Sequence, residues 1–560
     1  MKFRLFVLVG VVGLMTPLSA AKDSAIGVMV GNGDKERFSA ELSYPLADLA
    51  EGASFKLNVF EENGSIIERN TVNKRHVGIS PTVVFGAGSD FRLTASHTHL
   101  EKDDLPDFGI PQLFNRPAAV DRRQFYGFES DYLNSVSDTS IVALEHDINE
   151  KVTLTNTLKY GQTDFKLRAT APEFVTAPTL SNSLNDLLVK RTVIFTQSKE
   201  SFFSNELNVN ARFDTDRISH KLVSGVDYRE QRSTPLRYQF TGVSTTSLVN
   251  PNSADLFTGR STSTQNTVAD IKHISVHLTD TMALSKTLDF TAGARYDFID
   301  TGYLSRGASY LDLDSRKDFL SYRGAFDYKM AETGRVFLSY ARTFSTSAEW
   351  VAITEQTSNI DPEINSHYEV GTSWNLAKDR LFVKGSLFRT DRENVREVSA
   401  NITLLSGTQR VEGITLEALG HFTPKWDLSF GYQLVRSEVL ESEFFADTEG
   451  EKVANTPRQT LSLWSTHYLT DTAKLSAGAQ FVDSRRLTSI TPYDSVTGLA
   501  KEVPSYWTFS VVGSKEINHL WDLQVSIANL FNAKFYDVAS GSRVIPGEGR
   551  VIMLSVRLKI

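Results

Sequence analysis

The chain has 560 residues, with 67 acidic and 59 basic side chains, a formal net charge of −8 and no cysteine. The acidic balance argues against nucleic-acid binding, and the lack of cysteine excludes disulfides, thiol catalysis and metal sites with cysteine ligands. The mean hydropathy of −0.22 is typical of a soluble protein. It is equally compatible with a membrane β-barrel, whose strands are apolar on only one face.

Residues 1–21 are predicted to be a secretory signal peptide. Lys2 and Arg4 form a basic start, an uninterrupted apolar or glycine run follows, and small residues occupy positions 19–21. The run is too short to cross a bilayer as a helix, and no other stretch reaches about 18 apolar residues. We therefore expect export, cleavage before Lys22 and a mature chain of residues 22–560.

Alternation of apolar and polar residues recurs along the whole mature chain. Every second residue is apolar from Glu206 to Phe213, from Leu288 to Phe298 and from Ile552 to Ile560. A period of two indicates a β-strand with one apolar face. The predicted strands are about 9 to 14 residues long, whereas soluble strands usually have 5 or 6 and a tilted membrane strand needs roughly 9 to 11.

The connections between these strands alternate between short and long. Short turns are predicted at residues 85–88, 146–150, 331–334 and 376–379, and long polar connections near residues 102–130, 166–202, 232–268, 344–363 and 486–504. Bacterial outer-membrane barrels have such tight periplasmic turns and long external loops.

The sequence therefore predicts an all-β fold, a transmembrane antiparallel β-barrel of about 22 strands that forms a single domain. The first strand is expected near residues 25–30 and the last at residues 550–560. Pairing of these two strands would close the barrel and leave no backbone group unpaired in lipid. An even number of strands places both ends of the chain on the periplasmic side.

Several segments carry a more specific signal in their order and spacing. They are Leu105–Pro111, Arg123–Gly127, Pro362–Gly371, Leu387–Arg396, Gly407–Gly413, Asn455–Arg458, Val503–Tyr506 and Asn529–Tyr536. Together they resemble the barrel domain of TonB-dependent ferric-siderophore receptors, with the nearest likeness to the catecholate-type branch. The resemblance covers residues 25–560. It implies a receptor in the cell outer membrane of a Gram-negative bacterium, for which a ferric siderophore is the transported ligand and no cofactor is covalently bound. Its family partner would be the TonB-ExbB-ExbD complex.

The chain differs from the family pattern at both ends. Residues 25–30 and 38–44 resemble the first two barrel strands and follow the signal peptide directly. The family's N-terminal plug domain and TonB box need on the order of 130 to 150 residues, so the plug is expected to be missing. The chain also ends in Ile560, where such barrels commonly end in an aromatic residue.

A barrel without a plug leaves two alternatives to a TonB-coupled receptor. One is a passive porin-like channel for small solutes, because a barrel of this size would enclose a wide aqueous channel. The other is the barrel half of a split or degenerate receptor, whose plug is encoded separately.

A receptor for an anionic ferric siderophore needs cations and aromatic rings in a partly desolvated vestibule. The candidate siderophore-binding residues are Arg116, Arg122, Arg123, Phe125 and Tyr126 in the third long loop, and Arg229, Arg232, Arg237 and Tyr238 in the fifth. The alternative is that these arginines pair with loop carboxylates or with phosphates of lipopolysaccharide, which together with outer-membrane lipid is an expected partner.

Other chemistry-bearing residues do not form a recognisable site. No nucleophile, base and orienting group cluster in the sequence, so we predict that the protein is not an enzyme. The histidines have no metal-ligand spacing and are expected to face solvent or the lumen; they are His220, His273, His277 and His367. Four charged residues are predicted to form a ladder inside the barrel, namely Arg295, Asp297, Arg323 and Asp327.

Overall fold

The computed structural model describes residues 24–46, 48–307, 310–345, 361–399, 402–443, 445–540 and 542–560. The predicted signal peptide lies outside the described residues, as does most of the long connection predicted near residues 344–363. Among the described residues, no helix is long and apolar enough to cross a membrane.

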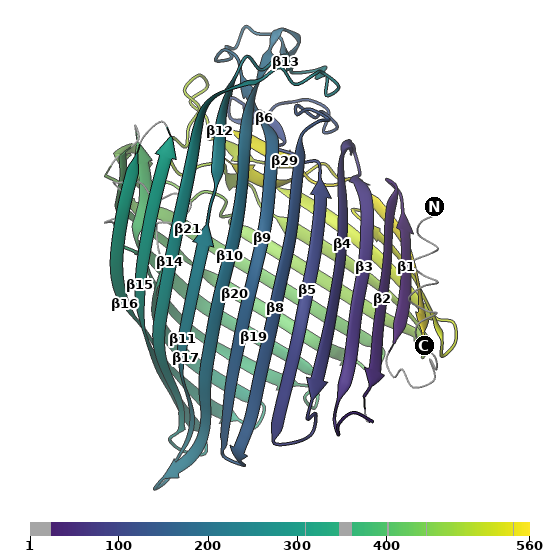
Figure 1. The fold of residues 1–560 in the computed structure, drawn as a ribbon, viewed down its shortest axis with the longest axis vertical. Helices are drawn as coiled ribbons and strands as arrows, with labels where there is room; N and C mark the ends of the chain where they lie inside the picture. Colours follow the sequence, from purple (N-terminus) through teal and green to yellow (C-terminus); the bar gives the residue numbers. More distant parts are fainter. Residues whose placement is uncertain are drawn as a thin grey trace.

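One antiparallel sheet closes into a barrel (Figure 1). Within the described residues the sheet has 24 strands. Two short strands, β12 (Leu236–Thr241) and β13 (Thr246–Ser247), pair with β10 beyond the end of β11 and extend the wall there. The other 22 described strands form the ring. The ring strands are β1 (Ala25–Gly31), β2 (Lys35–Pro45), β3 (Ser54–Ile66), β4 (Arg69–Phe85), β5 (Phe91–Asp104), β8 (Tyr132–Asn149), β9 (Val152–Phe174), β10 (Leu188–Thr215), β11 (Ile218–Ser233), β14 (Arg260–Ala283), β15 (Leu288–Gly307), β16 (Leu311–Ala331), β17 (Gly334–Ser345), β18 (Glu363–Leu376), β19 (Leu381–Ser399), β20 (Ile402–Thr423), β21 (Trp426–Glu441), β22 (Gln459–Thr470), β23 (Ala473–Val482), β26 (Tyr506–Glu516), β27 (Trp521–Ala528) and β30 (Val551–Lys559).

The ring is closed by β1 and β30, which pair from Ala25↔Lys559 to Gly31↔Met553. The predicted number of strands, their antiparallel order and the pairing of the first strand with the last are confirmed. Closure leaves the wall without an exposed edge, which a sheet in lipid requires.

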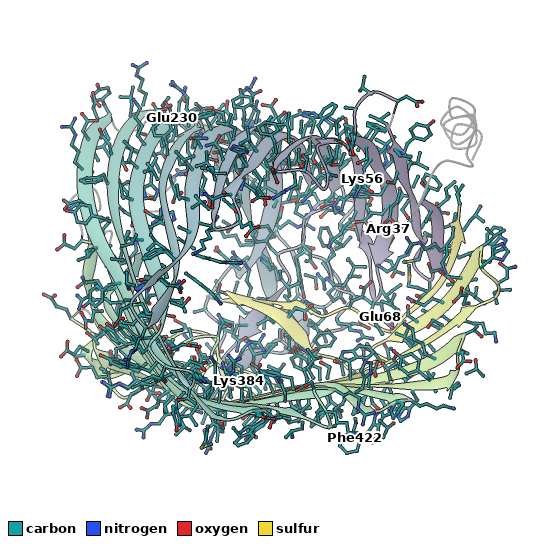
Figure 2. All side chains as sticks on the ribbon, turned by 90° about the horizontal axis from the view of Figure 1, so that it is seen from below. Arg37, Lys56, Glu68, Glu230, Lys384 and Phe422 are labelled. Atoms are coloured by element: carbon teal, nitrogen blue, oxygen red, sulfur yellow. The ribbon has the colours of Figure 1, made fainter. Side chains whose placement is uncertain are left out.

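The predicted alternation places apolar side chains on the outside of the wall. In β15, Tyr296 and Phe298 are 37% and 50% exposed, whereas Asp297 between them is 2% exposed. In a water-soluble fold such rings would be buried, so their exposure marks the surface that faces lipid. Figure 2, which looks along the barrel, shows Phe422 on the outer side of the wall and Lys384 on the inner side.

The two ends of the barrel differ, and we call them the turn end and the loop end. Short turns follow β4, β8, β16 and β18 at the turn end, as predicted. The strands run from 7 residues in β1 to 28 in β10, a wider range than predicted.

Two of the predicted loops are wrong, because long strands occupy much of their residues. Most of residues 166–202 belongs to β9 and β10, and much of residues 232–268 belongs to β12, β13 and β14. Beyond the apolar band neither face meets lipid, so apolar side chains are no longer confined to one face, as the consecutive residues Val193, Ile194 and Phe195 of β10 show. The alternation that identifies a membrane strand is therefore absent there. The connections near residues 102–130 and 486–504 are long, as predicted.

The loop end contains small elements of its own. They are β6 (Ile110–Leu113), β7 (Arg116–Pro117), η2 (Leu184–Asp186), η3 (Ala446–Thr448), β24 (Arg485–Arg486), β25 (Glu502–Val503), β28 (Tyr536–Ser540) and β29 (Arg543–Pro546). The elements β28, β29, β6 and β7 form one four-stranded sheet, and β24 pairs with β25.

Candidate functional site: the loop end and the lumen

Five connections at the loop end pack together into one structure, which we call the loop cap. It comprises residues 105–131, 175–187, 242–259, 483–505, 529–540 and 542–550. Its core is almost free of solvent contact and consists, with the first residues of β10, of Ile110, Ala118, Tyr126, Leu187, Val189, Leu248, Leu487, Val503 and Val544. In Figure 2 the yellow ribbon of the last connection lies inside the ring, so the cap reaches over the lumen.

Backbone hydrogen bonds join loops whose strands lie far apart in the ring. The strands β6 and β29 pair through Ile110↔Val544 and Pro111↔Arg543. The amide of Gln112 also donates to the carbonyl oxygen of Ser542 at 2.7 Å, and the amide of Glu502 to that of Asn115 at 3.0 Å. The strands that carry the first two of these loops are separated by β1 to β4, so the cap bridges that arc of the wall.

A buried arginine ties the cap to the short hairpin between β3 and β4. The side chain of Arg69 is 1% exposed, and its Nη2 donates to Oδ1 of Asp107 at 2.6 Å. It also donates to the carbonyl oxygen of Arg122. A buried ion pair with both partners hydrogen-bonded is costly to break, because either partner alone would be an uncompensated charge. Sequence analysis missed Arg69 because it lies at a hairpin tip outside the long loops.

Glu68, next to Arg69, forms a second link between separate loops. Its carboxylate lies 3.2 Å from Nη2 of Arg122 and 3.3 Å from Nε of Arg123. It also accepts a hydrogen bond from Nδ2 of Asn532 at 3.3 Å. The Asn532 amide, together with the two arginines, lowers the pKa of Glu68.

The five candidates of the third long loop all belong to the loop cap, but they are not alike. Arg122 is 6% exposed, and Phe125 and Tyr126 are 5% and 1% exposed. The Tyr126 hydroxyl donates to the carbonyl oxygen of Leu248 at 2.7 Å, and burial raises its pKa. Arg116 and Arg123 are exposed. Only these two therefore present their charge to solvent, while the other three hold the cap together.

The four candidates of the fifth loop lie in strands, which corrects that prediction. Arg229 and Arg232 belong to β11, and Arg237 and Tyr238 to β12. Arg229 stands opposite His273 on the lumen face, whereas Arg232 is on the outer face and lies 3.5 Å from Asp270. The Tyr238 ring packs against Phe195, with 4.9 Å between centroids. The nine candidates thus do not converge on one site.

The predicted charge ladder in the lumen is part of a tighter network. Nε of Arg295 is 2.8 Å from Asp297, which is 2.7 Å from Nε2 of His273, and Arg295 also binds Asp227. The other two residues of the predicted ladder have longer contacts with their neighbours. Arg323 is 3.5 Å from the Thr279 hydroxyl, and Asp327 is 3.9 Å from Arg335.

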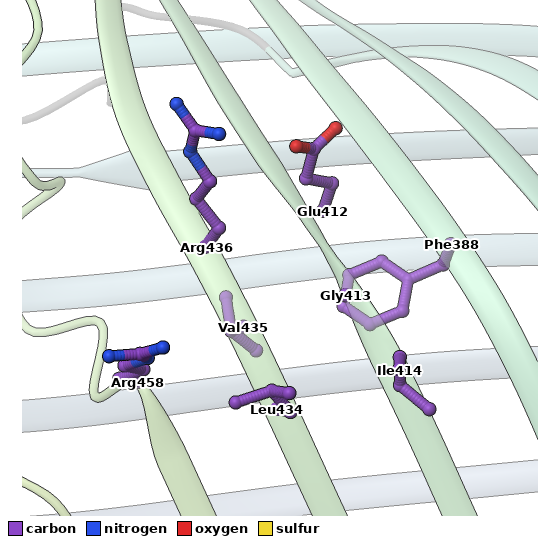
Figure 3. A pocket seen from close by; sticks show the side chains of 8 residues that line it. All are labelled: Phe388, Glu412, Gly413, Ile414, Leu434, Val435, Arg436 and Arg458. Carbon is purple, nitrogen blue, oxygen red and sulfur yellow. The ribbon is translucent and has the colours of Figure 1, made fainter.

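A pocket of about 370 Å³ lies in the wall at β19 to β21, close to the loop end. Figure 3 shows the Phe388 ring on one side of the pocket and Arg458 on the other, with Gly413 and Val435 between them. The complete lining is Phe388, Glu412, Gly413, Ile414, Leu434, Val435, Arg436 and Arg458. An aromatic ring and a cation around a recess offer stacking and charge-assisted hydrogen bonds. Phe388, Gly413 and Arg458 belong to the distinctive sequence segments, but their proximity was not predicted.

The sequence is similar to a described family over most of its length. Residues 77–530 match the family TonB dependent receptor-like, beta-barrel. The catecholate siderophore receptor Fiu of Escherichia coli K12 is 24% identical over 560 residues, covering 91% of this chain and 73% of that protein. The probable TonB-dependent siderophore receptor PiuA of Acinetobacter baumannii is 26% identical over 562 residues, covering 91% of this chain and 74% of that protein.

Solved structures share the fold. The crystal structure of the siderophore receptor PiuA from A. baumannii gives a TM-score of 0.87 at 24% identity, covering 96% of this chain and 82% of that one. The closed form of the ferric-catecholate import receptor Fiu from E. coli K12 gives a TM-score of 0.85 at 23% identity, with the same coverage.

Proposed function

Because the chain belongs to the TonB-dependent receptor-like β-barrel family, we propose that it is an outer-membrane receptor that binds a ferric siderophore at its loop end and serves iron uptake. The observation that carries this proposal is the similarity to siderophore receptors over 91% of the chain. A catecholate-type siderophore is favoured, since the E. coli relative is named for that ligand class.

The loop end supports this function through its exposed cations. Arg116 and Arg123 are exposed on a cap whose core is closed, and the Arg123 guanidinium group is positioned by ion pairs with Glu68 and Asp121. An anionic iron chelate would be attracted to such groups, and preorganised donors lose less entropy on binding. We therefore retain Arg116 and Arg123 as candidate ligand contacts and assign Arg122, Phe125 and Tyr126 to the architecture of the cap.

The partners proposed for the chain follow from the family and from the wall. The loop end would face the outside of the cell and the turn end the periplasm, where the TonB-ExbB-ExbD complex acts in this family. The apolar outer face, with residues such as Phe298, would contact membrane lipid, and the charged outer positions beyond it lipopolysaccharide. A cleaved signal peptide at residues 1–21 would export the chain.

Iron transport in a defined strain tests the main proposal. The chain is expressed in iron-starved E. coli that lacks its own catecholate receptors, and ⁵⁵Fe uptake is measured from a synthetic ferric tricatecholate. We expect uptake above the empty vector, and comparison of strains with and without an intact TonB protein shows whether this uptake is energised. Equal uptake with and without TonB would contradict energised transport, and no uptake above the empty vector would contradict the receptor function.

The second candidate function is a passive channel formed by a barrel without a plug. The strands of the described residues belong to the barrel sheet or to the two small sheets at the loop end, and about a quarter of the E. coli relative lies outside the match. Planar-bilayer conductance of the purified protein separates the alternatives. A steady conductance of porin size supports the channel. Its absence supports a lumen closed by the cap or by a separately encoded plug.

A further inference from the structure

Three of the distinctive sequence segments meet at the pocket in the wall. Phe388 comes from Leu387–Arg396 on β19, Gly413 from Gly407–Gly413 on β20, and Arg458 from the Asn455–Arg458 segment that precedes β22. The pocket lies on the side of β19 to β21 nearer the loop end, because Arg458 stands directly before the first residue of β22 at that end. A ligand that passes the loop cap would therefore meet it early.

The register of the wall places the floor of this pocket on the lumen face. Ile414 and Leu416 are 38% and 42% exposed and belong to the apolar outer face. Gly413 alternates with them and pairs with Val435, so both are directed towards the lumen. Phe388 pairs with Gly413, so its ring is on the same face, and a Cβ atom on Gly413 would clash with the carbonyl oxygen of Leu434 and lie 3.2 Å from Cε1 of Phe388. Glycine at this position therefore permits the close approach of the Leu434 backbone and adds no side chain beside the ring.

Arg458 supplies a cation that is not used by the wall itself. Its carbonyl oxygen accepts a hydrogen bond from the amide of Val435 at 2.8 Å, which fixes the residue beside the pocket. Its side chain is exposed, and within the described part of the chain no hydrogen bond or ion pair of its guanidinium is found. The neighbouring Arg436 is different, because it lies 3.1 Å from Glu438.

We propose that this pocket is a binding subsite in the lumen for an anionic aromatic group, namely a catecholate ring of the transported iron chelate. The inference rests on the proposed function and deepens it. Arg458 donates charge-assisted hydrogen bonds to the catecholate oxygens, and the Phe388 ring packs against the catechol ring. Gly413 and Val435 form the floor. A neutral chelate without an aromatic ring satisfies neither contact, so the subsite discriminates between siderophore classes.

Ligand titration of the purified full chain in detergent tests the subsite. A synthetic ferric tricatecholate quenches tryptophan fluorescence on binding, and the Kd is measured for the wild type, Arg458→Gln and Phe388→Leu. We expect Arg458→Gln to raise the Kd roughly tenfold, the usual scale for loss of a charge-assisted hydrogen bond. We expect a smaller increase for Phe388→Leu, which keeps the apolar volume but loses the ring.

The matched control is Arg436→Gln, which removes a neighbouring arginine whose side chain alternates to the outer face and already has an acidic partner. It is expected to leave the Kd unchanged. Heat-modifiable mobility on gels confirms that each variant is a folded barrel. A ferric trihydroxamate, which is uncharged, serves as the second probe, and its affinity should be the same for the wild type and Arg458→Gln.

The outcomes separate the subsite from the receptor function. If the wild type binds the tricatecholate and both pocket variants bind it equally well, the subsite is wrong and the receptor function stands. If Arg458→Gln weakens both probes alike, the effect is general and the subsite is again contradicted. If the wild type does not bind the tricatecholate, the proposed catecholate ligand fails, and the subsite fails with it.

Discussion

The loop cap and the barrel wall are built on opposite principles, although one chain forms both. In the cap, the side chains of Ile110, Leu248 and Val503 are at most 1% exposed. In the wall, Leu278 and Phe298 are about half exposed. The cap excludes water between its own side chains, as a soluble domain does. The wall depends on its hydrogen-bonded ladder and on lipid for its apolar surface. Changes to one should therefore leave the other largely intact.

The largest effect is expected for Arg69→Met, which breaks the ion pair between hairpin and cap. Asp107 would remain with its side chain 11% exposed and without its partner. Breaking a buried pair typically costs about 3–5 kcal/mol. Hydrogen exchange should become faster in residues 105–113 and 542–546 and stay unchanged in β15. The control Arg316→Met removes an 85% exposed arginine and should change neither region. Equal exchange in wild type and Arg69→Met would show that this pair does not anchor the cap.

A charge on the outer face tests the wall in the same way. Leu278→Arg places a cation where the side chain is 49% exposed to the lipid side. An arginine on this face costs about 2–4 kcal/mol at the bilayer midplane and less towards the interfaces. Chemical unfolding of the barrel in liposomes should detect this loss, with Leu278→Ile as the control. A shift in the exchange rate of the cap would contradict the independence of the two regions.

A smaller effect is expected from Tyr126→Phe within the cap. The variant keeps the ring but leaves the carbonyl oxygen of Leu248 without its hydrogen bond from the hydroxyl. An unsatisfied buried acceptor costs about 1–3 kcal/mol. Limited proteolysis of residues 242–259 should be faster in this variant. Tyr322→Phe changes a tyrosine of the wall and should not alter proteolysis of the cap.

The smallest effect is a pH dependence of the cap through Glu68. Its pKa is lowered from the ordinary value of 4.5, so its stabilising contribution is fully present above that value and is lost as the pH falls through the lowered pKa. The difference in cap exchange between wild type and Glu68→Gln should therefore shrink as the pH is lowered below 4.5. A difference that grows on acidification would contradict the assigned role of the carboxylate.

The wall could be predicted from the sequence and the cap could not, for a physical reason. Alternation in segments such as Leu288–Phe298 is imposed locally, because each residue faces either lipid or the lumen. The role of Arg122 depends on Asn532, which is more than 400 residues away. No local pattern records such a contact, so the burial of Arg122 and Tyr126 inside the cap could not be predicted. The pocket at Phe388 could not be predicted for the same reason, since its three segments meet only through strand register.

The pairing of β1 with β30 has a consequence for assembly. The first strand of the wall cannot obtain its second neighbour until the last strand has been synthesised, so the closing contacts have the largest sequence separation in the molecule. Contacts of this kind form slowly, because the loop between them must be ordered first. Before closure, β1 and β30 are open edges that can pair with other chains. The interval between export and closure is thus the period in which this protein is most prone to aggregation, and in which an assembly factor that covers a free strand edge would protect it.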